Sequence, residues 1–201
     1  ALGLGKVAIT GIFSTLTILI LTLYFLSSLP QIKSYFYRLA PRTRRARVML
    51  LGDEILNRIG GYVGGQLTIS IIAGASTYIF LLIVGLPYAL ALSLIVAATA
   101  LIPLIGATLG AIVVTIVGFL TGIPEGIACV IFFVVYQQTE NYLVAPRVMK
   151  RSVDVAPMVT VVAALIGGTL LGVVGALLAI PTAAAIALIV REVIMPRQEA
   201  Q

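Results

Sequence analysis

Residues 140–190 read ENYLVAPRVMKRSVDVAPMVTVVAALIGGTLLGVVGALLAIPTAAAIALIV, the segment that most clearly indicates how the chain folds. After Asp154 it carries no charged residue until Arg191. A run of this length is much longer than the roughly 20 apolar residues that one membrane-spanning helix needs. Residues that disfavour a regular helix gather inside it: Gly167, Gly168, Gly172, Gly175 and Pro181. Because glycine is conformationally free and proline lacks an N–H donor, the sequence predicts a broken helix or hairpin held inside the bilayer.

The composition is that of an integral membrane protein. Hydrophobic residues make up 61% of the chain and charged residues only 10%, whereas about a quarter of the residues in soluble domains are charged. The uncharged segments exceed about 18 residues, which indicates membrane helices rather than the short strands of a barrel. We therefore expect an all-α, polytopic helical membrane protein.

The same composition argues against several classes of function. The chain has one cysteine, Cys129, and no histidine, so an internal disulfide is excluded and metal or histidine-based catalysis is disfavoured. We expect no metal, no cofactor, no catalytic residue and no enzyme activity. The net charge of +6 is concentrated beside the apolar segments, which indicates membrane orientation rather than nucleic-acid binding.

The first third of the chain predicts one span followed by a basic segment. Residues 1–30 hold the span, which we expect Pro30 to close. Residues 31–66 are rich in basic side chains, so the positive-inside rule places them in the cytoplasm. Within them we expect a separate amphipathic helix after Pro41 and a flexible glycine junction at residues 60–65. Four arginines either bind anionic lipid headgroups or act only as a topology signal: Arg42, Arg44, Arg45 and Arg47.

Residues 67–195 form the predicted transport core, and residues 196–201 a cytoplasmic tail. The core contains two overlong apolar blocks, and the first, residues 86–121, is expected to break at Pro103 and Gly106. With the block at residues 156–190, this gives two broken or re-entrant helical hairpins that open on opposite faces of the membrane. Two full-length double spans would give the same parity, so both arrangements remain open.

One polar cluster ends an apolar helix just before the final block. Within it, Gln137 and Asn141 share a helix face, and Glu140 lies close to Gln137. If the cluster lies inside the bundle, Glu140 is a cation or proton acceptor; if it lies at the interface, it only ends the span. The candidate residues of a solute or ion pathway are those of this cluster and of the two breaks: Pro103, Gly106, Gln137, Glu140, Asn141, Gly167, Gly168 and Pro181.

Two stretches resemble characteristic elements of the autoinducer-2 exporter family, a group of bacterial and archaeal permeases. They are residues 86–112, LPYALALSLIVAATALIPLIGATLGAI, and residues 140–185, from Glu140 to Ala185. The positions that match the family pattern are Pro103, Gly106, Glu140, Asn141, Tyr142, Pro146, Pro157, Gly167, Gly168, Gly172, Gly175 and Pro181. Lys150 stands where the family often has glycine.

The resemblance implies a multi-pass protein of the bacterial or archaeal plasma membrane that assembles as a homo-oligomer. It also implies two further N-terminal spans, so we expect the chain to be a fragment. The expected function is export of a small solute, such as the quorum-sensing signal autoinducer-2, by alternating access around the two broken blocks. Two alternatives stay open: a sodium or other cation/proton antiporter that titrates Glu140, and a non-transporting membrane scaffold whose basic segment binds lipid or partners.

Overall fold

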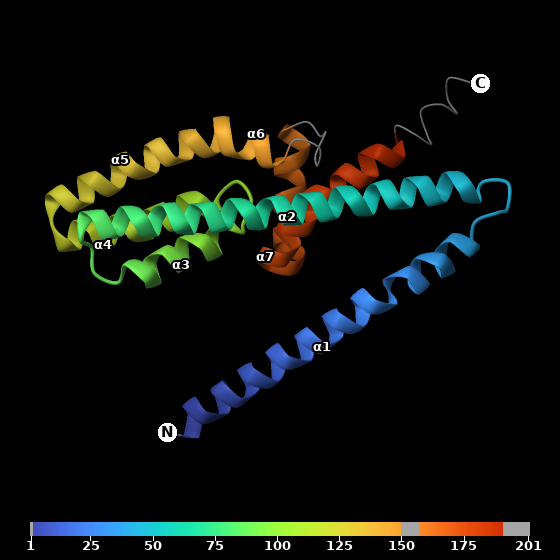
Figure 1. Cartoon of the computed structure of the whole chain (residues 1–201), viewed down its shortest axis with the longest axis horizontal. Helices are drawn as coiled ribbons and strands as arrows, with labels where there is room; N and C mark the ends of the chain where they lie inside the picture. Colours follow the sequence, from blue (N-terminus) through green and yellow to red (C-terminus); the bar gives the residue numbers. More distant parts are fainter. Residues whose placement is uncertain (1, 150–156, 191–201) are drawn as a thin grey trace. The chain divides into compact units, whose positions relative to one another are not determined.

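The computed structural model describes residues 2–149 and 157–190, which form helices joined by short turns, with no strand among them (Figure 1). The elements in order are α1 (Leu2–Arg38), α2 (Arg45–Val84), α3 (Ala89–Ala100), α4 (Gly106–Thr121), α5 (Ile123–Thr139), the π-helix η1 (Glu140–Val144), α6 (Ala145–Val148) and α7 (Pro157–Ile189). The all-α prediction is confirmed. The predicted tail at residues 196–201 lies outside the described residues, as do Lys150 and Asp154.

The apolar helices of the described residues fall into two length classes. Four segments are long and apolar enough to cross a membrane: Phe13–Arg38, Arg45–Val84, Ile123–Val148 and Met158–Ile189. The two shorter apolar helices are α3 and α4. At 1.5 Å per residue, α3 is only about 18 Å long, well below the roughly 30 Å thickness of the hydrocarbon core. The chain is therefore a polytopic helical membrane protein whose first apolar block consists of short helices.

The chain divides into two compact units, residues 1–53 and residues 54–201. In the first unit, side chains of α1 hold Asp53 of α2. The Tyr37 hydroxyl donates a hydrogen bond of 2.9 Å to Asp53 Oδ1, and the Lys33 ammonium forms an ion pair with the same carboxylate. Gly52 lies against the Tyr37 ring, so a side chain at position 52 would displace it. These contacts tie the end of α1 to the start of α2.

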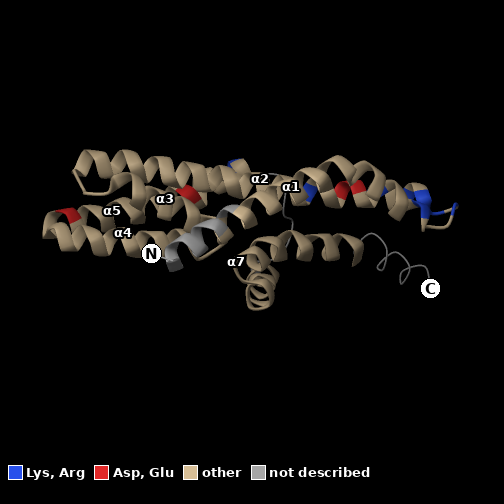
Figure 2. Ribbon diagram, turned by 90° about the horizontal axis from the view of Figure 1, so that it is seen from below, with Lys and Arg blue, Asp and Glu red and all other residues tan. Residues whose placement is uncertain are grey.

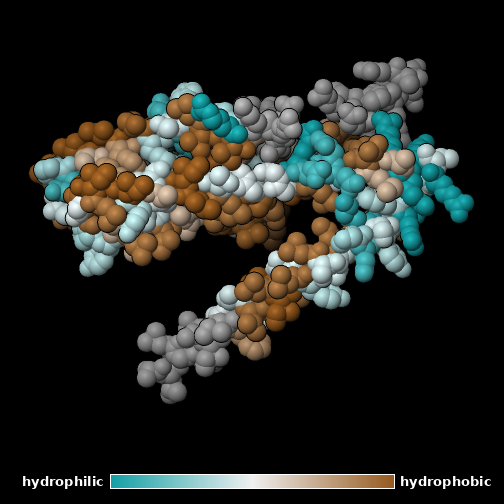
Figure 3. Space-filling view, viewed as in Figure 1, coloured by the Kyte–Doolittle hydropathy of each residue, from teal (hydrophilic) through white to brown (hydrophobic). Residues whose placement is uncertain are grey.

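The turn between α1 and α2 carries the predicted arginine cluster. Figure 2 shows basic residues gathered at this end of α2, and Figure 3 shows a hydrophilic surface over the same region. Arg45 has a structural role here, since its guanidinium donates to the carbonyls of Arg38 at 3.2 Å and Ala40 at 3.4 Å. It therefore occupies carbonyls that the end of α1 leaves without helical partners. Lipid binding by the cluster stays a prediction.

Two predicted helix boundaries in this part of the chain are wrong. Helix α1 continues through Pro30 to Arg38, and α2 runs without a break across the glycines at residues 60–65. The basic segment therefore holds neither a separate surface helix nor a glycine junction. Membrane helices tolerate internal proline and glycine, and Gly65 is buried against Val148 and Met149, where a small residue lets the segments approach closely.

The core of the second unit lies between α2, α3, α4 and α5. Its buried members include Leu81 of α2, Val96 of α3, Val114 of α4 and Phe133 of α5. Close packing relies on small residues, as where Gly74 lies against Ala97. The rings of Phe80 and Phe132 stack with their centroids 4.0 Å apart. These four helices form one packed body.

The first apolar block is a helical hairpin, and its break lies where the sequence predicts it. Helix α3 ends at Ala100 and α4 begins at Gly106, with Pro103 in the turn. Gly106 packs against the carbonyl of Thr99 so closely that a Cβ would overlap it. Leu104 has a positive φ of 72°, a conformation that side-chain-bearing residues rarely adopt.

The second block is also interrupted, at Leu171 (φ −133°, ψ 17°) and Gly172 (φ 62°, ψ −141°). The break confirms the predicted interruption among the glycines. The two arms of α7 turn back on each other, and a Cβ on Gly175 would overlap the Gly167 carbonyl. The prediction that Pro181 also interrupts the helix is wrong, because α7 continues through it. Whether the two hairpins are re-entrant stays a prediction.

Candidate functional site

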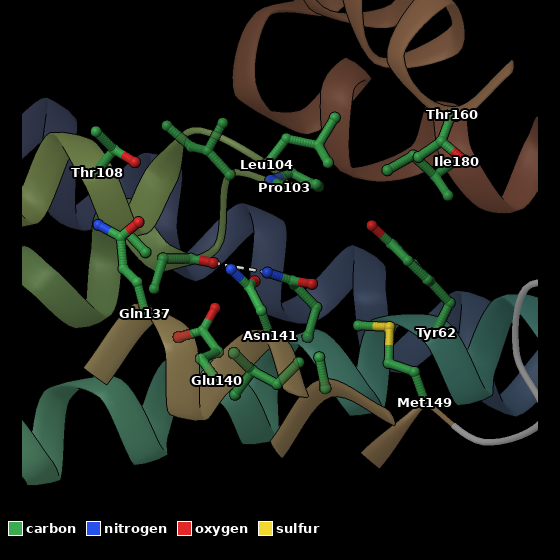
Figure 4. Close-up of a pocket in the computed structure, with 16 residues that line it drawn as sticks. Tyr62, Pro103, Leu104, Thr108, Gln137, Glu140, Asn141, Met149, Thr160 and Ile180 are labelled. Atoms are coloured by element: carbon green, nitrogen blue, oxygen red, sulfur yellow. Dashed lines mark hydrogen bonds between the residues drawn. The ribbon is translucent and has the colours of Figure 1, made fainter. Parts of the chain in front are cut away.

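The second unit contains a cavity of about 290 Å³ that is lined by polar side chains from several helices. Figure 4 shows Gln137, Glu140 and Asn141 reaching in from one side and Pro103 and Leu104 lying on the opposite side. The lining residues are Tyr62, Gln66, Ile69, Ala100, Ile102, Pro103, Leu104, Ala107, Thr108, Gln137, Glu140, Asn141, Ala145, Met149, Thr160 and Ile180. The cavity is thus bordered by α2, by the turn of the first hairpin, by the end of α5 with η1 and α6, and by α7.

Helix α2 supplies a fixed amide to the cavity wall. Gln66 is buried, and its Nε2 donates a hydrogen bond of 2.7 Å to the carbonyl of Ala100, the last residue of α3. One turn further along α2, the Ser70 hydroxyl donates at 2.6 Å to the carbonyl of Ala97. The last carbonyls of a helix lack intrahelical donors, so these two side chains satisfy the end of α3 and hold the first hairpin against α2.

The wall formed by α5 contains a widened helical turn. In η1 the N–H of Ala145 bonds to the carbonyl of Glu140, five residues earlier, instead of four. Pro146 explains the widening, because it lacks an N–H and its ring clashes with the carbonyl four residues before it. Glu140 and Asn141 lie at the start of this turn. Short π-helical segments frequently occur at functional sites.

Glu140 places a carboxyl group in the cavity wall. Its Oε2 atom is buried, as is the hydroxyl of Tyr136 one turn earlier on α5. These two groups interact with each other. Polar side chains inside a membrane protein usually mark a substrate or ion pathway, which favours a functional role for this end of α5.

The turn of the first hairpin forms the opposite wall. Pro103 is buried and lines the cavity, and the strained residue Leu104 lies beside it. Gly106 does not line the cavity; it allows the close packing of α3 against α4 described above. Backbone strain in non-glycine residues is found preferentially at functional sites, which adds to the case for this turn.

Helix α7 borders the cavity through residues other than those predicted. Thr160 and Ile180 line it, whereas Gly167 lines an apolar groove between the two arms of α7. A Cβ added at Gly168 would make only an ordinary contact, with the Ala176 side chain. The Pro181 side chain is fully buried. The structure thus brings Pro103, Gln137, Glu140 and Asn141 together, and it leaves the predicted residues of α7 outside the cavity.

Several polar groups of the site are not among the residues predicted from the sequence. Tyr62 and Gln66 of α2 and Thr160 of α7 line the cavity, and none of them was among the predicted pathway residues. Gln66 carries a signal that points to it, since it is an isolated amide at the start of a long apolar run, and polar side chains in membrane helices usually face a partner or a cavity. No group of three or more histidine, cysteine, aspartate or glutamate side chains that would suit a metal ion occurs among the described residues.

The comparisons with known proteins agree on one family. The family model described as "AI-2E family transporter" matches residues 2–195. The Bacillus subtilis protein named "Putative transport protein YueF" is 30% identical over 89% of this chain and 50% of its own length. "Putative transport protein YrrI" of the same organism is 31% identical over 88% of this chain and 52% of its own length.

A third relative comes from another bacterial group, and all three are longer proteins. "Putative transport protein MT0215" of Mycobacterium tuberculosis is 34% identical over 88% of this chain and 48% of its own length. The chain thus spans about half the length of the curated relatives that it matches. No solved structure matches it significantly.

Proposed function

Because this chain belongs to the AI-2E family of transporters, we propose that its cavity is the solute site of a permease that moves a small polar molecule across the cell membrane. The observation that carries the proposal is the collection of hydrogen-bonding side chains from separate helices around one cavity. Polar groups are costly inside a membrane protein and usually mark a substrate or ion pathway. No catalytic residue is needed for this function.

The size of the cavity suits a small solute. Its volume of about 290 Å³ is near the lower end of the range of small-molecule sites. Since one water in the liquid occupies about 30 Å³, the cavity has room for roughly ten non-hydrogen atoms. Autoinducer-2, the namesake of the resembling family, is the first solute to test, with export as the expected direction. Assembly as a homo-oligomer is part of the same proposal.

Alternating access requires that such a site be exposed to one side of the membrane at a time. Both broken blocks border the cavity, the first through Pro103 and the second through Thr160 and Ile180. We expect transport to displace α7 against the packed body of α2, α3, α4 and α5. The two hairpins then act as re-entrant elements whose turns lie at membrane depth.

A cation/proton antiporter is the second candidate, and one observation favours it. Glu140, an acidic side chain in the wall of a membrane-protein cavity, is the kind of group that exchanges a proton for a cation in membrane pumps and transporters. If this candidate is right, Glu140→Gln abolishes a sodium- or proton-coupled ion flux. Solute flux that survives this substitution without ion coupling favours the exporter instead.

The decisive experiment fills the cavity in the full-length protein. Ala107 lines the cavity, so Ala107→Trp places a large ring where the solute would bind. We expect autoinducer-2 flux in sealed proteoliposomes to fall at least about tenfold, since displacing a bound solute removes most of its binding energy. Ala91→Trp is the matched control, because Ala91 is exposed on α3 of the same hairpin and does not line the cavity.

The two variants separate the possible outcomes. Loss of flux in Ala107→Trp with normal flux in Ala91→Trp supports the cavity as the solute site. Equal flux in both variants and the unaltered protein would show that the solute passes elsewhere. An unaltered protein that moves neither autoinducer-2 nor an ion would contradict the permease proposal itself.

A further inference from the structure

Among the described residues, the cavity wall carries charge of one sign only. Among the described residues that line it, Glu140 is the only one with a charged side chain. The remaining polar side chains there are amides and hydroxyls, which can accept as well as donate hydrogen bonds. An anion that enters the cavity would therefore lose its hydration and meet a carboxylate, with no cation among those residues to compensate it.

Gln66 adds a second acceptor whose orientation is set by the fold. Its Nε2 is engaged with the carbonyl of Ala100 at 2.7 Å, and an amide group is planar. The bond to Ala100 uses the amide nitrogen, so the carbonyl oxygen Oε1 is not engaged by Ala100 and can act as an acceptor. Gln66 lines the same cavity as Glu140, so the cavity wall holds an amide acceptor as well as a carboxyl group.

We propose that this cavity selects solutes by charge: it takes molecules that donate hydrogen bonds to Glu140 and Gln66, and it rejects anions. The proposal rests on the proposed transport function and deepens it, because it names the chemical class of the solute and two side chains that determine specificity. Glu140 is the acidic side chain of the cavity wall, and Gln66 supplies a neutral amide that is hydrogen-bonded to α3.

The test compares two four-carbon solutes of similar size that differ in charge, erythritol and its acid anion erythronate. Flux of each is measured in sealed proteoliposomes with the full-length protein, with the membrane potential clamped at zero. We expect erythritol to move at least about tenfold faster than erythronate, an effect of one carboxylate within a poorly hydrated site. In Glu140→Gln the ratio should fall below about threefold, mainly because erythronate moves faster.

The matched control for the charge change is Glu125→Gln. Glu125 lies in the first turn of α5, away from the cavity lining, so this variant loses the same charge and should keep the ratio of the unaltered protein. For Gln66, the variant Gln66→Met removes the amide at similar size and should reduce erythritol flux about tenfold. Ser70→Ala is its control, because Ser70 also bonds to α3 and does not line the cavity.

Equilibrium binding of both solutes to the protein in nanodiscs separates the proposed charge selectivity of the cavity from the proposed transport function. Selective binding without flux keeps the charge selectivity and contradicts transport. Flux with an erythritol-to-erythronate ratio that Glu140→Gln leaves unchanged contradicts the charge selectivity and keeps transport. Absence of both binding and flux for erythritol overturns the inference, as does a Ser70→Ala variant that loses as much erythritol flux as Gln66→Met.

Discussion

At the scale of single residues, Leu104 shows how the cavity constrains the chain. Its φ of 72° lies in the left-handed region, where a side chain crowds the backbone at a cost of roughly 1–2 kcal/mol. Its side chain is 61% exposed, so little burial is gained in return. The conformation persists because the turn between α3 and α4 must close over five residues with Pro103 buried. The strained residue therefore lies in the cavity wall itself.

Replacing Leu104 tests this account. Glycine tolerates a positive φ, so Leu104→Gly should leave the stability of the detergent-solubilised protein unchanged or raise it by up to about 1 kcal/mol. Ile105→Gly is the control, because Ile105 is similarly exposed but has a φ of −111°, and it should lower stability by about 0.5–1 kcal/mol. SDS or thermal unfolding measures both. If Leu104→Gly destabilises as much as Ile105→Gly, the turn is not strained.

At the scale of elements, α7 depends on two glycines that let its arms approach. Gly167 and Gly175 meet through their backbones, whereas Gly168 has space for a Cβ. Small residues are the usual means of close helix packing in membranes, where there is no strong hydrophobic force between helices. The backbone of Gly172, at a φ of 62°, then provides the reversal. The hairpin thus depends on three glycines: Gly167 and Gly175 allow the arms to approach, and Gly172 allows the chain to reverse direction.

A valine at position 175 should force the arms apart. We expect Gly175→Val to widen the mean distance between spin labels on the two arms by about 2–4 Å, because a branched side chain prevents close helix approach. Labels at Val162→Cys and Ala183→Cys suit the measurement, since both positions border the groove between the arms, in a Cys129→Ala background.

Gly168→Ala serves as the control for this measurement. Its added methyl group would meet the Ala176 side chain at 3.8 Å, an ordinary contact, so the label distance should not change. Equal distances in Gly175→Val and the unaltered hairpin would mean that the approach of Gly167 and Gly175 does not hold the arms together.

The breaks within the apolar blocks could be predicted from sequence because their causes are local. Pro103 lies in the turn after α3, Gly106 begins α4, and Gly172 adopts the non-helical conformation that interrupts α7. Proline and glycine favour such breaks through their own backbone chemistry. The same reasoning failed at Pro30 and Pro181, because membrane helices tolerate proline when the surrounding structure satisfies the freed groups.

The cavity was only partly predictable, since it depends on tertiary contacts. Gln137, Glu140 and Asn141 stand together in the sequence, and their position beside Pro103 follows from the packing of α5 against the first hairpin. Gln66 lies far from them in sequence and meets α3 through one hydrogen bond across 34 positions. No periodicity in the sequence encodes such a contact. The polar cluster is therefore visible in the sequence, whereas the contribution of Gln66 to the same cavity is not.

At the scale of the whole molecule, the length of α2 bears on how the protein lies in a membrane. Its 40 residues extend about 60 Å, about twice the hydrocarbon thickness. A large part of α2 must therefore lie beyond the hydrocarbon core. The charged residues of α2 are all in its first half, from Arg45 to Arg58, so this half is the part that projects into water.

This arrangement predicts a topology that labelling can measure. In a Cys129→Ala background, Arg42→Cys in the basic turn should react with a membrane-impermeant maleimide only after cells are permeabilised, because basic segments stay in the cytoplasm. Thr121→Cys, at the turn between α4 and α5, should react in intact cells. Labelling of Arg42→Cys in intact cells would contradict the predicted orientation. The unaltered protein is the control for background, since its Cys129 is buried.

The widened turn at Glu140–Val144 also limits how the cavity can change shape. An extra residue in a helix can in principle migrate along it, as a dislocation travels through a crystal lattice, and each step would rotate the side chains it passes. Pro146 pins this defect, because the missing N–H stays at one position of the chain. Glu140 and Asn141 therefore keep one orientation relative to α5, and rigid displacement between helices is left as the means of reshaping the cavity.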